Sequence, residues 1–341
     1  MRRTRLLVAW LALLVAACGP RAADPGPAAT PAPGVMGLAS PTPGDAPAGP
    51  GTPGSTGTPD PLDALFAATS EPPRTPGLGE GRVVEVGGVE LFVKCMGEDS
   101  PTVVLEHGMG ASSQDWVVVQ PEIAEFARAC SYTRARWGAE DTSPERRTTR
   151  RIVGELRALL EKVGAPGPYI LVGHSFGGLT ARLYEHEYPE QVAGMVLVDA
   201  SHPDQLEEWP PTADENPEGI DLGASRKQLA GLGQLGEMPL AVLTAGRLEL
   251  PAGMPESRAR AERRFWRRWQ TWQGELARLS SNSTHARATE SGHMIQIEAP
   301  ELVVEAVRQV VEAARTGEPV PPCGEALESV GGQCVDVARQ S

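Results

Sequence analysis

The chain has 341 residues, and its 31 lysines and arginines against 44 aspartates and glutamates give a net charge of −13 at pH 7. A surplus of acidic groups repels phosphates, which excludes nucleic acid as an expected partner. The residues after position 79 are numerous enough to bury one sizeable hydrophobic core.

The N-terminus has the pattern of an export signal. Residues 1–5 are basic, and residues 6–17 are apolar but too few to span a bilayer. They end in Val-Ala-Ala-Cys18, which resembles a bacterial lipoprotein signal, in which the cysteine is lipidated and becomes the new N-terminus. An ordinary secretory signal with a cysteine at its cleavage site is the alternative. We expect residues 1–18 to direct export and to anchor the protein, through Cys18, to a membrane of the cell envelope.

Residues 19–79 are mostly Pro, Gly, Ala, Ser and Thr. A segment of this composition lacks the apolar side chains of a core, so a disordered tether is expected. The folded domain is then expected over residues 80–316, followed by a tail at 317–341.

Four cysteines remain besides Cys18, and they are Cys95, Cys130, Cys323 and Cys334. An even number in an exported chain favours two disulfides, for which three pairings exist. A short glycine-containing loop between the last two favours a local bond in the tail, which leaves the first two to pair. Four buried thiols are the alternative. The sequence has no Cys-x-x-Cys spacing, which makes a metal site the less favoured interpretation.

Strands and helices are expected to alternate through the domain. Gly87-Gly88 between two β-rich runs predicts a hairpin. The expected strands are 82–86, 89–94, 102–106, 130–134, 169–172, 194–199, 240–245 and 284–289. The expected helices are 116–128, 149–163, 179–188, 256–279 and 300–314. Two antiparallel strands followed by this alternation predict an α/β fold, with a mostly parallel eight-stranded sheet and helices on both faces.

Residues 173–177 read Gly-His-Ser-Phe-Gly and lie between an apolar strand and a helical pattern. Gly-x-Ser-x-Gly in this context is typical of a nucleophile elbow, a tight turn that crowds the positions two before and two after the serine. A glycine-rich turn with an idle serine is the alternative. The context favours Ser175 as a nucleophile, which needs a base within hydrogen-bond reach.

Four motifs in order carry a family resemblance: His-Gly-Met-Gly at 107–110, the elbow, Val-Asp-Ala at 198–200, and Ser-Gly-His at 291–293. With them, residues 81–316 resemble an α/β-hydrolase fold enzyme. The resemblance implies that the second strand lies beside the fourth, and hence a Cys95–Cys130 disulfide next to Cys323–Cys334. It also places a short lid at residues 201–237.

The resemblance implies a role for each candidate site residue. His293 is the expected base for Ser175, since it lies in the loop after the last parallel strand. The acid that orients the histidine follows one of two strands; Asp199 is favoured, Glu249 is second and Asp204 third. The oxyanion hole is expected from two backbone N–H groups, those of Met109 and Phe176.

A serine hydrolase that cleaves carboxylic esters through an acyl-enzyme is therefore expected, without a metal or organic cofactor. Its expected partners are a small-molecule ester or lipid-like substrate and a membrane reached through Cys18, with the protein itself a monomer. Acyl transfer or amide cleavage on the same triad is an alternative, because one fold hosts many reactions. A non-catalytic surface-binding lipoprotein on a hydrolase scaffold is another.

The expected helix at 256–279 is rich in arginine and aromatic residues. Its residues of these kinds are Arg258, Arg260, Arg263, Arg264, Phe265, Trp266, Arg267, Arg268, Trp269 and Trp272. Contact with a membrane surface is one interpretation. The favoured one packs the aromatic rings on the sheet and leaves the arginines in water.

Overall fold

The computed structural model describes residues 81–135, 147–208, 216 and 218–337. The expected signal peptide, Cys18 and the tether at 19–79 lie outside the described residues. Part of the expected lid, at 209–215 and 217, lies outside them as well. Within the described part of the chain, no helix combines the length and the apolar character needed to cross a bilayer.

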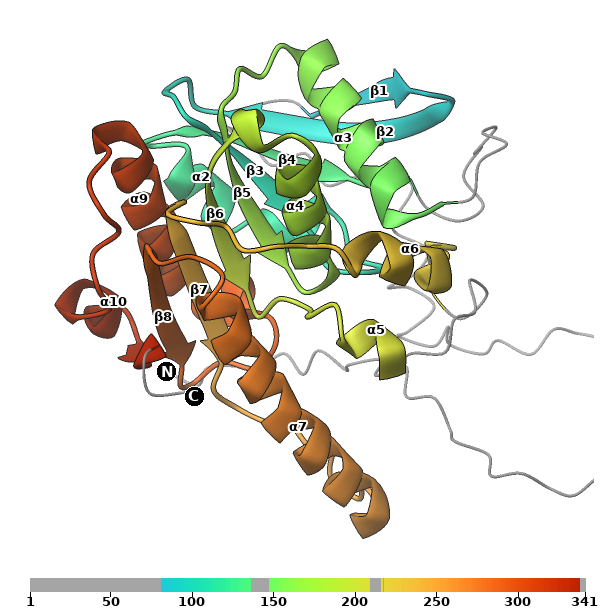
Figure 1. Cartoon of the computed structure of the whole chain (residues 1–341), viewed down its shortest axis with the longest axis vertical. Coiled ribbons are helices and arrows are strands. Elements are labelled where there is room, and N and C mark those ends of the chain that lie inside the picture. The colour runs from blue at the N-terminus through green and yellow to red at the C-terminus, as the bar shows by residue number, and fades with distance from the viewer. Residues whose placement is uncertain (1–80, 136–146, 209–215, 217, 338–341) are drawn as a thin grey trace, which may run out of the picture. The chain divides into compact units, whose positions relative to one another are not determined.

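The described residues form one sheet in the order β1-β2-β4-β3-β5-β6-β7-β8-β9 (Figure 1). Pairing is parallel from β4 through β8 and antiparallel at both ends of the sheet. The strands are β1 (Arg82–Val86), β2 (Val89–Met96), β3 (Thr102–Glu106), β4 (Arg128–Thr133), β5 (Tyr169–His174), β6 (Val192–Val198), β7 (Leu240–Ala245), β8 (Ser283–Ala288) and β9 (Gly332–Cys334). This confirms the expected α/β architecture.

The sheet has one strand more than expected, since β9 brings the number among the described residues to nine. This strand is short and lies in the segment that we expected to be only a tail. It pairs antiparallel with β8, with Cys334 opposite Ala286. Three residues without an apolar alternation give no strand signal, because their pairing depends on the edge that β8 offers.

Helices cover both faces of the sheet. One core cluster gathers buried residues of α3 (Thr149–Val163), α4 (Phe176–Glu187), α6 (Leu222–Leu229) and α7 (Glu256–Ala277). The other gathers those of α2 (Val119–Ile123) and α9 (Pro300–Thr316). The remaining helical elements are η1 (Ser113–Trp116), η2 (Pro189–Gln191), α5 (Gln205–Glu208), α8 (Ile295–Glu298) and α10 (Glu325–Ser329). Strands between two helical layers are buried on both faces, and every residue of β3, β5 and β7 is buried.

The expectation of one helix over residues 116–128 is wrong. The chain instead makes the 3-10 turn η1 and then the short helix α2. Trp116, Val119 and Ile123 are buried at a helical spacing, which produced the expectation. The helix ends early because Arg128 already pairs with Thr102 of β3.

Both expected disulfides are present. Cys95 and Cys130 lie opposite each other where β2 pairs with β4, with their Cα atoms 4.1 Å apart. Cys323 and Cys334 join the segment after α9 to β9, with their Cα atoms 5.4 Å apart. The pairing of the second strand with the fourth thus brings the first two cysteines within bonding range.

Candidate active site

The sharp turn between β5 and α4 presents Ser175. Its backbone has φ 52° and ψ −123°, a conformation that residues other than glycine rarely adopt. A Cβ at Gly173 would lie 2.6 Å from the Gly177 carbonyl oxygen, and one at Gly177 would lie 2.4 Å from the Glu106 carbonyl oxygen. Both glycines are therefore required by close backbone contact, as the elbow motif predicts.

Asp199 and His293 meet at the carboxyl ends of the parallel strands. Asp199 follows β6, and His293 lies in the loop between β8 and α8. The Nδ1 atom of His293 is 2.6 Å from Oδ2 of Asp199. An acid at this distance can hold one tautomer of the imidazole and stabilise its protonated form.

The second oxygen of the Asp199 carboxylate accepts two further hydrogen bonds. The Ala245 N–H donates to Oδ1 at 2.9 Å, and the indole N–H of Trp269 donates to the same atom at 2.8 Å. Asp199 is only 1% exposed, so these donors replace the water that a carboxylate loses on burial. Sequence reasoning had assigned Trp269 to packing, and no local signal distinguishes it from Trp272.

The two other candidate acids have different partners. The Glu249 carboxylate lies 2.7 Å from the guanidinium of Arg247, which also pairs with Glu298. The Asp204 side chain is 59% exposed and faces His202. Of the three candidates, Asp199 is thus the one that the structure brings to Nδ1 of His293.

His174 connects the elbow to the loop that carries His293. Its Nε2 lies 3.0 Å from the His293 carbonyl oxygen, and the centroids of the two rings are 4.6 Å apart. Burial holds the pKa of His174 well below its usual range, so the ring is neutral and Nε2–H donates to that carbonyl. A Cβ at Gly108 would lie 3.0 Å from His174 Nδ1 and 3.4 Å from Ser175 Cβ. The loop after β3 therefore packs directly against the elbow.

The two expected oxyanion donors flank this point. Phe176 is the first residue of α4, and N–H groups in the first turn of a helix have no acceptor within the helix. Met109 lies in the loop after β3, next to Gly108. Phe176 thus follows Ser175 directly, and Met109 follows Gly108, where an added Cβ would lie 3.4 Å from Ser175 Cβ.

A fully buried arginine holds the loop after β3. The Arg134 guanidinium donates to the carbonyl oxygens of His107 at 2.8 Å and Gly108 at 2.7 Å. It also bonds Glu106 at 2.9 Å and grips both carboxylate oxygens of Glu218, at 2.8 and 2.9 Å. Glu218 lies in the expected lid segment, so Arg134 ties that segment to the loop. Sequence reasoning missed this network, because its members are far apart in the chain.

The carboxylates around this arginine differ in how they titrate. Burial raises the pKa of Glu106, although Arg134 opposes that shift. Burial also tends to raise the pKa of Glu218, but Arg134 and the Gly110 N–H outweigh it and lower that pKa to about 2. Close by, burial raises the pKa of Asp115 to about 6 against the opposing charges of Arg134 and His293. Asp115 Oδ2 has no hydrogen-bond partner among the described residues.

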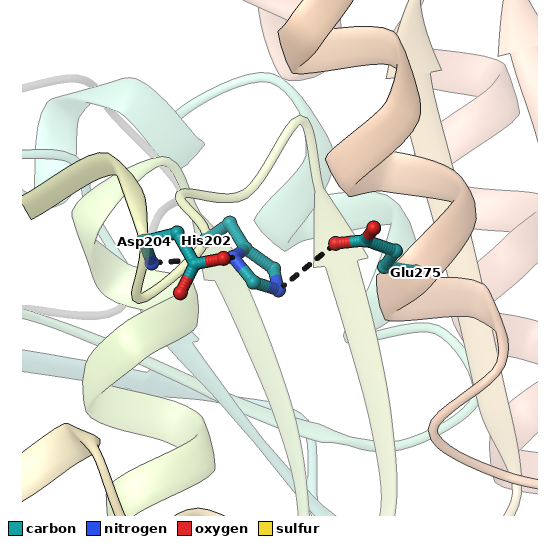
Figure 2. A group of neighbouring side chains, drawn as sticks. All are labelled: His202, Asp204 and Glu275. Carbon is teal, nitrogen blue, oxygen red and sulfur yellow. Dashed lines mark hydrogen bonds and ion pairs between the residues drawn. The ribbon is translucent and has the colours of Figure 1, made fainter.

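Three potential metal ligands lie beside this site, and Figure 2 shows them. They are His202, Asp204 and Glu275, whose ligand atoms lie within 4.8 Å of one another. The Asp204 N–H donates to His202 Nδ1 at 3.2 Å, so the ring proton is on Nε2, which faces Glu275 at 3.6 Å. Binding a cation at Nε2 would therefore require the other tautomer of His202 and the loss of this hydrogen bond.

Comparison with known proteins places the chain in a family. A family model described as alpha/beta hydrolase fold matches residues 101–271. The uncharacterized protein YqjL of Bacillus subtilis is 30% identical over 232 residues, which cover 64% of this chain and 86% of YqjL. Lipase LipV of Mycobacterium tuberculosis is 33% identical over 116 residues, which cover 33% of this chain and 42% of LipV.

Among solved structures, DBJA superposes with a TM-score of 0.51 at 15% identity, covering 70% of this chain and 99% of DBJA. At this identity the likeness shows a shared fold. The match to the family model, the similarity to most of YqjL and the observed sheet order all indicate the same family. This chain belongs to the α/β hydrolase fold family.

Proposed function

We propose that this protein is a serine hydrolase that cleaves carboxylic esters through an acyl-enzyme. Ser175 is the nucleophile, His293 the base and then the acid, and Asp199 the residue that orients the histidine. The observation that carries the proposal is the 2.6 Å contact between Asp199 and His293, at the strand ends where the elbow presents Ser175. Membership in the family supports a hydrolase, and the relative named a lipase supports an ester as substrate.

The proposed reaction needs two proton transfers in each half. His293 Nε2 takes the proton of the Ser175 hydroxyl as its oxygen attacks the ester carbonyl, and the N–H groups of Met109 and Phe176 bind the resulting oxyanion. The imidazolium, stabilised by Asp199, then protonates the departing alcohol. Water enters, loses a proton to His293 and attacks the acyl-enzyme. The returning proton restores the Ser175 hydroxyl and frees the acid.

The acyl group of the substrate is proposed to be lipid-like. One relative that shares a third of this chain is named a lipase, which supports testing long acyl chains beside short ones. A panel of p-nitrophenyl esters of increasing chain length, run with matching anilides and with added alcohol acceptors, distinguishes esterase, amidase and acyltransferase activity. Faster turnover of anilides than of esters, or new esters of the added alcohol in place of free acid, would contradict ester hydrolysis.

A fluorophosphonate probe tests the nucleophile directly, since it labels a serine only when a neighbouring base activates it. We expect the full chain to be labelled and Ser175→Ala to lose both labelling and ester turnover. Ser281→Ala, a change of an exposed serine far along the chain, is the control and should be labelled like the wild type. A folded wild-type protein that resists the probe would support the surface-binding alternative.

A further inference from the structure

Helix α7 brings a tryptophan into contact with the proposed catalytic acid. Trp269 lies in the second half of α7 and is 5% exposed. Its indole N–H donates to Asp199 Oδ1 at 2.8 Å. Its ring also stands edge-on to that of His293, with centroids 5.7 Å apart and planes at 76°. The side chain therefore contacts two of the three residues that the proposed reaction uses.

We infer that Trp269 is a positioning residue, which fixes Asp199 so that Oδ2 faces His293. The inference rests on the proposed function. The carboxylate has two equivalent oxygens, and the Trp269 and Ala245 N–H groups both occupy Oδ1. That leaves Oδ2 for the histidine, at 2.6 Å. Asp199 also has a φ of 39°, so its backbone is in an uncommon conformation.

The indole N–H also adjusts the charge that the histidine meets. A hydrogen bond to a carboxylate draws electron density from it and stabilises its ionised form. With Trp269 in place, part of the Asp199 charge is therefore offset on the side away from His293. Removing the donor leaves Ala245 to hold the carboxylate, while the full negative charge faces the ring. The imidazolium that forms during the reaction then meets a more fully charged carboxylate and is stabilised more strongly.

Trp272 provides a matched control on the same helix. It is 3% exposed and contacts the Trp269 ring at 6.5 Å and the Phe265 ring at 6.1 Å. Its ring stacks on His202, with centroids 5.8 Å apart. A phenylalanine at either position keeps an aromatic side chain in the core, but only the change at Trp269 removes the bond to Asp199.

The test compares Trp269→Phe, Trp272→Phe and wild-type full chain on one ester. We expect Trp269→Phe to lower kcat by about tenfold with little change in KM. The ascending limb of its kcat/KM profile should move to higher pH, whereas Trp272→Phe keeps the wild-type limb. An unchanged kcat and limb in folded Trp269→Phe would overturn the inference, and so would equal effects of both variants. A wild type without esterase activity would instead refute the proposed function.

A second measurement does not depend on the folding of the tryptophan variants. In the ¹⁵N-labelled Ser175→Ala protein, the indole N–H resonance of Trp269 should lie downfield of those of the other tryptophans and shift as the pH is varied. Adding Asp199→Asn should move it upfield, because the charged acceptor is lost. A Trp269 resonance that stays the same as pH varies and after Asp199→Asn would overturn the inference.

Discussion

Two residues other than glycine have positive φ among the described residues, and they are Ser175 and Asp199. They follow the neighbouring strands β5 and β6, and backbone hydrogen bonds link them: Ser175 N–H donates to Val198 O, and Ser201 N–H donates to Ser175 O. Strained backbone persists where the surrounding structure imposes it, and such positions concentrate at active sites. The two strained residues are also the proposed nucleophile and acid.

The identity of the acid is tested by two substitutions that keep size and remove charge. Asp199→Asn should lower kcat by about a thousandfold to ten-thousandfold, because an amide favours the wrong tautomer of His293. Glu249→Gln should change kcat by less than about threefold, since that carboxylate pairs with Arg247 near the surface. Steady-state turnover of one ester measures both. A large loss in Glu249→Gln alone would assign the acid to Glu249.

Asp115 should destabilise the folded protein at neutral pH. Its pKa is raised to about 6 by burial, so the folded state binds its proton more tightly than the unfolded state does. The contribution of Asp115 to the free energy of unfolding therefore falls as pH rises from about 4 to about 6. We expect Asp115→Asn to raise the unfolding free energy at pH 8 by about 1–2 kcal/mol and to lose most of that gain at pH 4.

Urea unfolding at the two pH values measures this effect. Asp99→Asn, which changes an exposed carboxylate, is the control and should differ from wild type by less than about 0.5 kcal/mol at either pH. A stability gain in Asp115→Asn that is equal at pH 4 and pH 8 would rule out the titration as its cause.

At the scale of elements, the loop after β3 and Glu218, in the segment expected to form a lid, share one buried arginine. Arg134 holds the carbonyl oxygens of the loop and the Glu218 carboxylate together, and Glu218 in turn accepts the Gly110 N–H. Removing one partner of a buried ion pair leaves the other without compensation. The geometry of the loop that contains Met109 thus depends on a residue more than a hundred positions later.

Glu218→Gln should lower the unfolding free energy by about 3 kcal/mol at pH 6. The folded pKa of Glu218 is lowered to about 2, so its contribution is fully present above about pH 4.5 and is lost as pH falls toward 2. The difference between variant and wild type should therefore shrink at pH 3. Urea titrations at both pH values check this, with Glu161→Gln, from an exposed pair with Arg157, as the control.

The sequence predicts the elements whose signals are local. The Gly-x-Ser-x-Gly turn, the apolar runs of β3, β5 and β7, and the glycine pair between β1 and β2 carry their own patterns. Positions that depend on distant partners leave no such pattern. Trp269 differs from Trp272 in its contact with Asp199, which the sequence around it does not indicate. Arg134 ends an expected strand, and only its contact with the distant Glu218 distinguishes it.

At the scale of the whole molecule, the arrangement of α7 decides between two interpretations of its sequence. Trp269 and Trp272 are buried, Phe265 is half-buried, and the arginines are exposed. In Figure 1 the N-terminal half of α7 extends beyond the end of the sheet. Trp269 and Trp272 are thus used for packing, as the favoured interpretation expects, while Trp266 is half-buried like Phe265.

Membrane attachment is instead proposed to come from Cys18. Each buried CH₂ of an acyl chain contributes about 0.8 kcal/mol, so more than one acyl chain on this cysteine would hold the domain at a bilayer. In a bacterial host, we expect wild type to enter the detergent phase in a Triton X-114 separation and Cys18→Ala to stay in the aqueous phase. Ser175→Ala should behave as wild type, because attachment does not use the active site. Detergent-phase recovery of Cys18→Ala would show that another segment holds the protein to the membrane.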